Sequence, residues 1–387
     1  MSTVIDPQTK LYTRQTSTIM NTLTDNLLKN YTQNVPEYLL SGYQCKIFPS
    51  GMSAIYTLMH CVAIKNSNPT FVIGNELYCD TPKVVKYIQS YIPNLKCISL
   101  DVSDNDMIRQ TFIENQIDLF YIESCTNPSG KIFDYSLVSE LKGSQYNTIF
   151  ACDNTWLSSI IFNPIDHGFD VVIESMTKYI SASTRISGML ITNNLIINDI
   201  INYIKIAGIH VCSETCNTIN INLLTLESRI INVSRLTRQV IDYMTSISQE
   251  NNITKIYHPC IENSQFYYLA DTYFNKHDNY ILYPGIVLFH IATKNRQVRN
   301  ILKVVSNIFS IKLETSYGAP YSKICNYFRY GKSDKYGRCD NVADGVWLRL
   351  SIGYESDFES LKKSLDFIFE NSKKKNFNYD KYMKEIE

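Results

Sequence analysis

The chain lacks several features that mark large classes of protein. Its 387 residues contain no run of about 18 apolar residues, which is the length that a transmembrane helix requires. The polar start, residues 1–17, has no apolar core of a secretory signal. An excess of one charge is also missing, because 37 Lys and Arg balance 37 Asp and Glu. We therefore expect neither a membrane nor a nucleic acid among its partners.

Cysteine pairs of the C-x-x-C type are absent too. The 11 cysteines are odd in number and spread evenly along the chain. That distribution favours reduced thiols in a cytoplasmic protein over a disulfide framework. The closest pair, Cys212 and Cys216, follows His210, but no second ligand pair stands at a zinc-like spacing. We expect buried or half-buried thiols near a helix start there and no metal site.

The glycine-rich phosphate motifs of nucleotide-binding proteins are also missing. No G-x-G-x-x-G follows a predicted strand. Gly331, Lys332 and Ser333 resemble the end of a P-loop, but the position of its first glycine is occupied by Asn326. These two observations exclude the common dinucleotide and P-loop sites.

Strand and helix signals alternate through the first half of the chain. Short apolar runs predict strands at 71–74, 96–101, 118–124, 147–154, 170–175 and 187–194. Helical patterns at 53–64 and 82–92 separate some of them. The alternation predicts an α/β fold with a mostly parallel sheet that is covered on both faces.

The pattern differs on either side of this region. A helical spacing begins after Thr18, and residues 197–248 are helical, with one long amphipathic helix over 223–244. Beyond residue 250, the segments 285–292 and 347–354 alternate like strands of a smaller, half-covered sheet.

The chain is expected to end in a helix and a charged tail. Residues 356–371 have helical spacing behind an N-cap at Ser356, and the tail from Lys373 is expected to fray. We predict an N-terminal arm at 1–45, a large domain at 46–248 and a small α+β domain at 249–387.

The segment 151–178 is the most informative for chemistry. Asp153 follows one apolar strand and Lys178 follows the next. In an open α/β sheet such strand ends line the ligand crevice. There a lysine can form a Schiff base with an aldehyde cofactor, an aspartate can keep a pyridinium nitrogen protonated, and the hydroxyls of Ser175 and Thr177 suit a phosphate. A surface lysine and a helix-capping aspartate explain this segment equally well.

Three other segments allow a site or ordinary structure. Gly51 and Met52 open a helix where backbone N–H groups can approach a phosphate, although an ordinary helix start looks the same. Tyr78, just past a strand, is placed to stack on a flat ring or simply to pack. Arg349 lies between apolar strand residues, so its guanidinium needs either a substrate carboxylate or an internal acid.

Taken together, these segments resemble the pyridoxal-phosphate (PLP) enzymes of cysteine and methionine metabolism, the cystathionine γ-synthase/γ-lyase family. The likeness covers residues 11–370, and its blocks keep the family's order. These blocks read YTRQTST, SGMSAI, ESCTNPSG, CDNTWLS, ESMTKYI and VWLRLSIGYE. The resemblance implies a type I aminotransferase-like PLP fold, with pyridoxal 5'-phosphate as cofactor.

The resemblance also implies roles around the cofactor. Lys178 is similar to the Schiff-base lysine, Asp153 to the pyridinium partner and Tyr78 to the ring-stacking residue. The residues that resemble the phosphate cradle are Gly51, Met52, Ser175 and Thr177.

Further implied roles concern the neighbouring subunit and the substrate. Tyr12 and Arg14 resemble arm residues that reach the phosphate of a second subunit, which implies a homo-oligomer, either a dimer or a tetramer. Asn127, Ser316 and Arg349 resemble the contacts to the carboxylate of an amino-acid substrate.

The sequence departs from the family at a few positions. Ala182, Ser183 and Arg185 stand where the family has G-H-x-D, and 316–322 reads SYGAPYS in place of SLGG-x-E-S. The arm has T-S-T at 16–18 in place of N-P-T. The first and third changes affect cofactor geometry, and the second affects substrate choice. FPSGMSAI, Y-x-D-T-x-K and APYSKICNY are closest to the fungal-type cystathionine γ-synthase branch.

The resemblance implies transsulfuration chemistry. We expect γ-replacement, in which cysteine and an O-activated homoserine form cystathionine. The alternative is a carbon–sulfur lyase that acts on cystathionine or methionine. An alternative of another class is an inactive PLP-type scaffold, against which the joint presence of Lys178, Asp153, Tyr78 and Arg349 argues.

Overall fold

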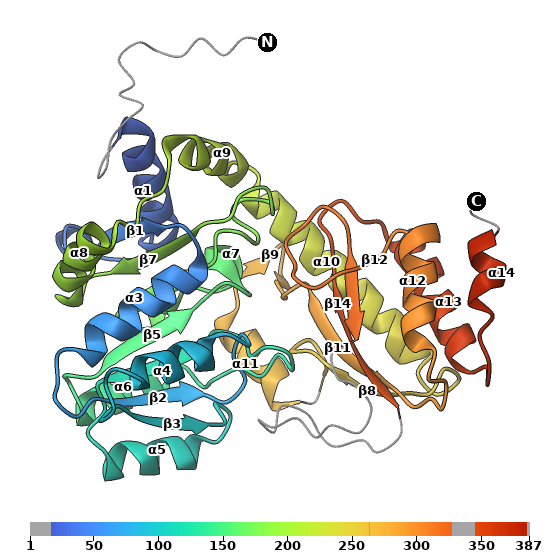
Figure 1. Cartoon of the computed structure of the whole chain (residues 1–387), viewed down its shortest axis with the longest axis horizontal. Helices are drawn as coiled ribbons and strands as arrows, with labels where there is room; N and C mark the ends of the chain where they lie inside the picture. The colour runs from blue at the N-terminus through green and yellow to red at the C-terminus, as the bar shows by residue number, and fades with distance from the viewer. Residues whose placement is uncertain (1–16, 263, 327–344, 385–387) are drawn as a thin grey trace.

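The computed structural model describes residues 17–262, 264–326 and 345–384. A large sheet with its helices lies beside a smaller sheet with its own helices, on the left and right of Figure 1. The strands of the large sheet are β1 (Gln44–Phe48), β2 (Thr70–Gly74), β3 (Lys96–Leu100), β4 (Leu119–Glu123), β5 (Ile149–Asp153), β6 (Val171–Glu174) and β7 (Gly188–Thr192). The helices of this half are α1 (Thr18–Tyr31), α2 (Glu37–Leu40), α3 (Gly51–Ala63), α4 (Thr81–Gln89), α5 (Asn105–Glu114), α6 (Leu137–Ser144), α7 (Ser158–Ile161), the 3-10 helix η1 (Pro164–His167), α8 (Ile196–Ala207) and α9 (Ser213–Leu223).

The central strands of the large sheet are buried on both faces. Its strand order is β1-β7-β6-β5-β4-β2-β3, and the five strands from β6 to β3 run parallel. Alternate residues of β2 enter two different cores: Phe71 and Ile73 share one with residues of α3, α4 and α8, while Val72 shares the other with residues of α5 and α6. Such double coverage explains why the central strands are continuously apolar. It confirms the predicted α/β class.

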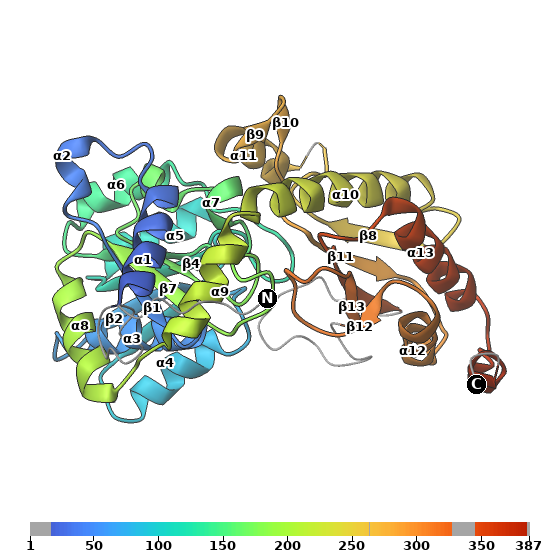
Figure 2. The ribbon, with the colours of Figure 1, turned by 90° about the horizontal axis from the view of Figure 1, so that it is seen from above.

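The smaller sheet is mostly antiparallel, in the order β12-β13-β14-β11-β8. The elements of this half are α10 (Leu226–Ser246), β8 (Ile253–Tyr257), α11 (Gln265–Tyr273), β9 (Lys276–His277), β10 (Tyr280–Ile281), β11 (Ile286–Ile291), α12 (Val298–Ile308), β12 (Lys312–Leu313), β13 (Lys323–Asn326), β14 (Val346–Ser351), α13 (Phe358–Ser372) and α14 (Tyr379–Lys384). Helix α10 contacts α7 in the first half and β8, β11 and α13 in the second, so it links the two (Figure 2). In the described part of the chain, no helix is long and apolar enough to cross a membrane.

All six predicted strands of the large sheet are confirmed within a few residues. Strand β1 was not predicted, because QCKIF is short and mixes polar with apolar residues. It joins the sheet at its edge, antiparallel to β7. The predicted boundary between arm and large domain, at residues 45 and 46, falls inside β1. The domain division stays a prediction. The predicted long helix at 223–244 is α10, which begins at Leu226.

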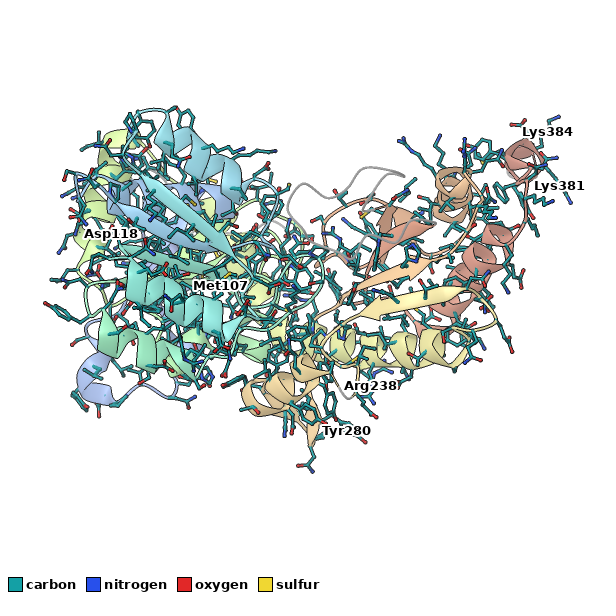
Figure 3. All side chains as sticks on the ribbon, turned by 90° about the horizontal axis from the view of Figure 1, so that it is seen from below. Met107, Asp118, Arg238, Tyr280, Lys381 and Lys384 are labelled. Carbon is teal, nitrogen blue, oxygen red and sulfur yellow. The ribbon has the colours of Figure 1, made fainter. Side chains whose placement is uncertain are left out.

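Two expectations near the C-terminus are wrong. The N-cap of α13 is Asp357, whose Oδ1 accepts from the Ser360 N–H at 2.9 Å, and not Ser356. The tail after Lys373 does not simply fray, because α14 forms and contacts α12. Phe377 is buried, and its ring stacks on Tyr382 at 5.2 Å. This apolar anchor holds a segment whose charged residues, such as Lys381 and Lys384, lie at the outer end of the molecule (Figure 3).

His258 is a buried histidine that joins parts of the second half. Its Nε2–H donates to the Pro284 carbonyl at 2.9 Å, and its Nδ1 accepts from the Cys260 N–H at 3.1 Å. Both ring nitrogens are thus used by the neutral form. Burial lowers the pKa of His258 to about 4.

This burial predicts sensitivity to acid. Between about pH 6.5 and pH 4, His258 is protonated in the unfolded chain but stays neutral in the folded chain. Acid therefore favours unfolding in this window. We expect the free energy of unfolding to fall by on the order of 3 kcal/mol across this window because of His258.

The measurement is urea unfolding of wild type and His258→Gln from pH 7 to pH 4, at one protein concentration. In the His258→Gln variant, the free energy of unfolding should depend much less on pH than in wild type. The His277→Gln variant, changed at an exposed site, should keep the pH dependence of wild type. The same pH dependence of the free energy of unfolding in wild type and in His258→Gln would contradict the prediction.

Candidate active site

The chemistry-bearing residues gather at the carboxyl ends of β4, β5 and β6. Asp153 is the last residue of β5 and is buried. Its carboxylate accepts from the Thr155 N–H at 3.0 Å and from the Tyr121 hydroxyl at 3.3 Å. Burial raises the pKa of Asp153, while these hydrogen bonds and the nearby charge of Lys178 oppose that rise. The site therefore holds a buried carboxyl group within the electrostatic reach of the Lys178 amine.

Lys178 follows β6 and is partly buried. Its Nζ donates to the Ser316 Oγ at 3.0 Å and lies 5.6 Å from the centre of the Tyr317 ring. Burial lowers the pKa of Lys178, and the positive charges of Arg349 and Lys323 lower it further. A lysine with a lowered pKa offers more of the neutral amine, which is the form that attacks a carbonyl or accepts a proton.

The loop at 316–318 closes over Lys178 from the second half of the molecule. Gly318 has φ of 79°, and a Cβ there would lie 2.6 Å from the carbonyl carbon of Lys178. Only glycine allows this approach. The Ser351 hydroxyl donates to the Ser316 carbonyl at 2.9 Å and so ties the loop to β14. The two halves thus build this side of the site together.

The start of α3 forms a candidate phosphate cradle. The hydroxyl of the N-cap Ser50 accepts from the Ser53 N–H at 3.1 Å in a capping box. Gly51 follows, and a Cβ on it would lie 2.7 Å from the Cβ of Ser175. Met52 lies next in this first turn and is half-buried. The missing side chain lets a helix N-terminus meet Ser175, an arrangement that favours a bound anion.

Thr177 lies two residues after Ser175, and its hydroxyl is already hydrogen-bonded within the protein. It donates to the Ser187 carbonyl at 3.1 Å and accepts from the Ser187 N–H at 3.1 Å. These bonds close the connection between β6 and β7 just before Lys178 turns inward. A contact of Thr177 with phosphate stays a prediction.

Tyr78 lies on the loop between β2 and α4. Its backbone N–H donates to the carboxylate of Glu123, the last residue of β4, and its ring is 41% exposed. The loop is therefore fixed while much of the ring remains open. Stacking of this ring on a cofactor stays a prediction.

Asn127 and Arg349 meet although they are 222 positions apart. The Arg349 Nη1 donates to the Asn127 Oδ1 at 3.3 Å, and both residues are buried. Arg349 lies in β14, where Leu288 and Cys325 are its partners on the neighbouring strands. An arginine and an amide side by side can both donate hydrogen bonds to a carboxylate.

Other predicted residues are less informative. Tyr12, Arg14 and the segment Gly331–Ser333 lie outside the described residues. Cys125 and Cys152 are fully buried, and burial raises the pKa of both thiols.

The departure at Ala182 and Ser183 has a structural consequence. Both residues have a positive φ, of 55° and 60°, where glycine is the favoured residue. The Ser183 hydroxyl donates to the Tyr317 carbonyl at 3.2 Å. The turn thus carries local backbone strain and contacts the loop that covers Lys178.

Several site residues were missed by sequence reasoning. Thr155 supplies its backbone N–H to Asp153, and Tyr317 packs its ring against Lys178. Glu76 braces the turn that carries Asn127. The only available signals were the Asp-x-Thr spacing at 153–155 and a glutamate just past a strand. Neither signal identifies a partner that is distant in sequence.

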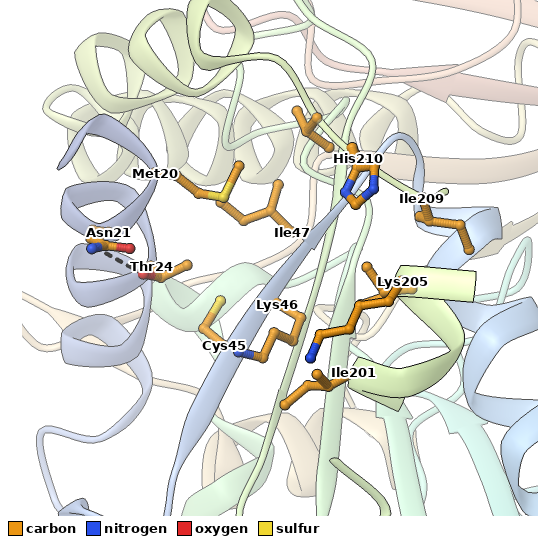
Figure 4. A pocket seen from close by; sticks show the side chains of 12 residues that line it. Met20, Asn21, Thr24, Cys45, Lys46, Ile47, Ile201, Lys205, Ile209 and His210 are labelled. Atoms are coloured by element: carbon orange, nitrogen blue, oxygen red, sulfur yellow. Dashed lines mark hydrogen bonds between the residues drawn. The ribbon is translucent and has the colours of Figure 1, made fainter. Parts of the chain in front are cut away.

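A separate pocket of about 230 Å³ lies between α1, β1 and α8 (Figure 4). Lys46, Lys205 and His210 line part of it. It contains none of the predicted site residues that the structure describes. The candidate active site is defined instead by the contacts around Lys178.

Comparison with known proteins gives the family. The family model described as "Cys/Met metabolism PLP-dependent enzyme" matches residues 8–370. A cystathionine beta-lyase of Schizosaccharomyces pombe is 23% identical over 333 residues, which cover 85% of this chain and 80% of the relative. A cystathionine gamma-lyase of Bacillus subtilis is 23% identical over 340 residues, covering 86% of this chain and 84% of the relative.

A solved structure agrees in fold. Cystathionine gamma synthase from Xanthomonas oryzae pv. oryzae, in complex with cystathionine, matches with a TM-score of 0.78 and 20% identity, covering 96% of this chain and 90% of that chain. The likeness confirms the type I PLP fold. With a family model spanning most of its length, the chain belongs to the Cys/Met metabolism family of PLP-dependent enzymes.

Proposed function

We propose that this protein forms cystathionine by γ-replacement, joining the thiol of cysteine to the carbon skeleton of an O-activated homoserine. The observation that carries an amino-acid reaction is Lys178, a partly buried amine of lowered pKa that donates a hydrogen bond to Ser316 and feels the charge of the buried Asp153. The motifs of the fungal-type branch favour replacement, and assignment to that branch stays a prediction. The second candidate is a carbon–sulfur lyase, which is favoured by relatives that are themselves named cystathionine lyases.

The residues present fit pyridoxal phosphate. A Cβ at Gly51 would overlap Ser175, so the missing side chain lets the N-terminus of α3, with its backbone N–H groups, lie directly against Ser175. We propose that Gly51, Met52, Ser175 and Thr177 hold the phosphate. We further propose that Lys178 binds the aldehyde carbon, Asp153 the ring nitrogen, and Tyr78 one face of the ring. When bound, the cofactor draws electrons away from the Cα of an amino-acid substrate.

The chain's own residues then have defined tasks. The Lys178 amine takes the proton from the substrate Cα and can return a proton at a neighbouring carbon, since its lowered pKa suits both directions. Ser316 orients the amine through its hydrogen bond. Arg349 and Asn127 bind the substrate carboxylate and fix which bond at Cα faces Lys178.

We also propose a homo-oligomer in the cytoplasm, either a dimer or a tetramer, in which Tyr12 and Arg14 complete the neighbouring site. Exposed apolar side chains at Ile186, Ile221 and Leu224 support a contact between copies. Free thiols at the described cysteines support a reducing compartment.

The test is an assay of the protein loaded with pyridoxal phosphate, using two substrate sets. Cysteine with O-acyl homoserine should yield cystathionine. Cystathionine alone should give little keto acid and ammonia. The reverse result would establish the lyase. A protein that stays colourless with added cofactor and shows no activity with either substrate set would indicate an inactive scaffold.

A further inference from the structure

Glu76 is a buried carboxylate that the reaction described above does not use. It lies just past β2 and is 1% exposed. Its Oε2 accepts from the Thr126 hydroxyl at 3.0 Å, the Ser129 N–H at 3.2 Å and the Ser129 hydroxyl. Its Oε1 lies 3.6 Å from the Lys131 Nζ. Every one of these contacts goes to the turn at residues 126–131.

That turn is closed on itself by its own hydrogen bonds. The Thr126 N–H donates to the Lys131 carbonyl, and the Gly130 N–H to the Thr126 carbonyl, each at 2.9 Å. The Lys131 N–H donates to the Thr126 hydroxyl, also at 2.9 Å. These bonds give the turn a shape, but they do not fix where it lies relative to the sheet. The contacts with Glu76 tie the Thr126 and Ser129 side of the turn to the end of β2.

Asn127 stands inside this turn. Its Oδ1 accepts from Arg349, which leaves the Nδ2–H groups of the amide to face a substrate. A carboxylate can only accept hydrogen bonds, so the amide nitrogen is the end that must point to it. The orientation of the amide therefore depends on the position of the turn as well as on Arg349.

We propose that Glu76 is a positioning residue for substrate recognition, holding the 126–131 turn so that Asn127 and Arg349 bind a carboxylate together. The inference rests on the proposed function, since it takes the Asn127–Arg349 pair as the carboxylate contact. Burial of Glu76 raises its pKa, whereas the Ser129 hydroxyl and the charge of Lys131 oppose that rise. Its hydrogen bonds with Thr126 and Ser129 need an oxygen acceptor at this point in the fold.

The test uses two small amines that differ only in the carboxylate. Glycine and methylamine are titrated into the cofactor-loaded protein, and binding is read from the change in the visible spectrum. Glu76→Ala should weaken glycine binding roughly 10- to 100-fold, because a shift of about 1 Å in a positioning group has effects of this size. Its affinity for methylamine, and the visible spectrum without amine, should match those of wild type.

Two further variants sharpen the result. Asp101→Asn removes the other carboxylate that pairs with Lys131 but touches neither Thr126 nor Ser129, so glycine should bind as in wild type. Glu76→Gln keeps an oxygen acceptor and should lose glycine affinity only about 3- to 10-fold. It serves as the test if Glu76→Ala does not fold.

Equal losses for glycine and methylamine, or no loss of glycine binding, would overturn the inference. A failure of the proposed carboxylate contact looks different, because the wild-type protein itself would then bind glycine no more tightly than methylamine.

Discussion

Lys178→Ala is expected to abolish the visible absorption band of the cofactor-loaded protein and to lower kcat by at least about 10²- to 10⁴-fold, the range for loss of a catalytic acid or base. Alanine cannot bind the aldehyde carbon of the cofactor and has no amine to move the Cα proton. The surrounding contacts give no replacement, since Ser316 has a hydroxyl that does not act as a base at neutral pH. The measurement is the spectrum after loading, followed by steady-state rates with both substrate sets.

The matched control for this variant is Lys205→Ala. Lys205 is an exposed lysine that lines the separate pocket in Figure 4 and contacts none of the site residues described here. Its removal should leave both band and rate unchanged. A Lys178→Ala protein with the wild-type band and rate would refute the role of this amine.

Asp153→Asn is expected to show the second large effect, a loss of roughly 10²- to 10³-fold in kcat, comparable to removing one preorganised electrostatic contact. The amide keeps the size of the carboxylate and an oxygen that Thr155 can reach, so the fold should persist. What disappears is the negative charge that the buried site presents to the cofactor ring. Without it the ring nitrogen is less readily protonated, and charge at Cα is less well stabilised.

The measurements are kcat and the dissociation constant of the cofactor. Asp170→Asn is the control, because Asp170 precedes β6 at the opposite end of the sheet, where it pairs with Lys142 at 2.5 Å. That variant should change stability but not the spectrum or the affinity for cofactor. Wild-type turnover by cofactor-loaded Asp153→Asn would show that the charge is not needed.

The strands of the large sheet and the residues at their carboxyl ends could be predicted from local patterns in the sequence. The short apolar runs marked β2 to β7, because buried parallel strands need apolar residues on both faces. Asp153 and Lys178 were placed correctly at strand ends, since the end of an apolar run can be read locally. Strand β1 was missed for the same reason, because an edge strand of mixed composition has no strong local signal.

Capping was predicted only approximately. Ser356 and Asp357 both suit an N-cap, and only the backbone path decides that Asp357 accepts from Ser360. The tail was judged from its charge, whereas the few apolar residues around Phe377 decided its packing.

The contacts between residues far apart in the sequence could not be predicted in this way. Asn127 reaches Arg349 across 222 positions, and Lys178 reaches Ser316 across 138. Both contacts join the two halves of the molecule, so they depend on how α10 and the smaller sheet pack against the large one. Local periodicity reports which face of an element is buried, but it does not report the partner across that face. The positions of Asp153 and Lys178 at strand ends were therefore readable in the sequence. The contacts of Glu76 with the 126–131 turn depend on the tertiary fold, and the cover of Lys178 by Tyr317 and Gly318 depends on how the two halves pack.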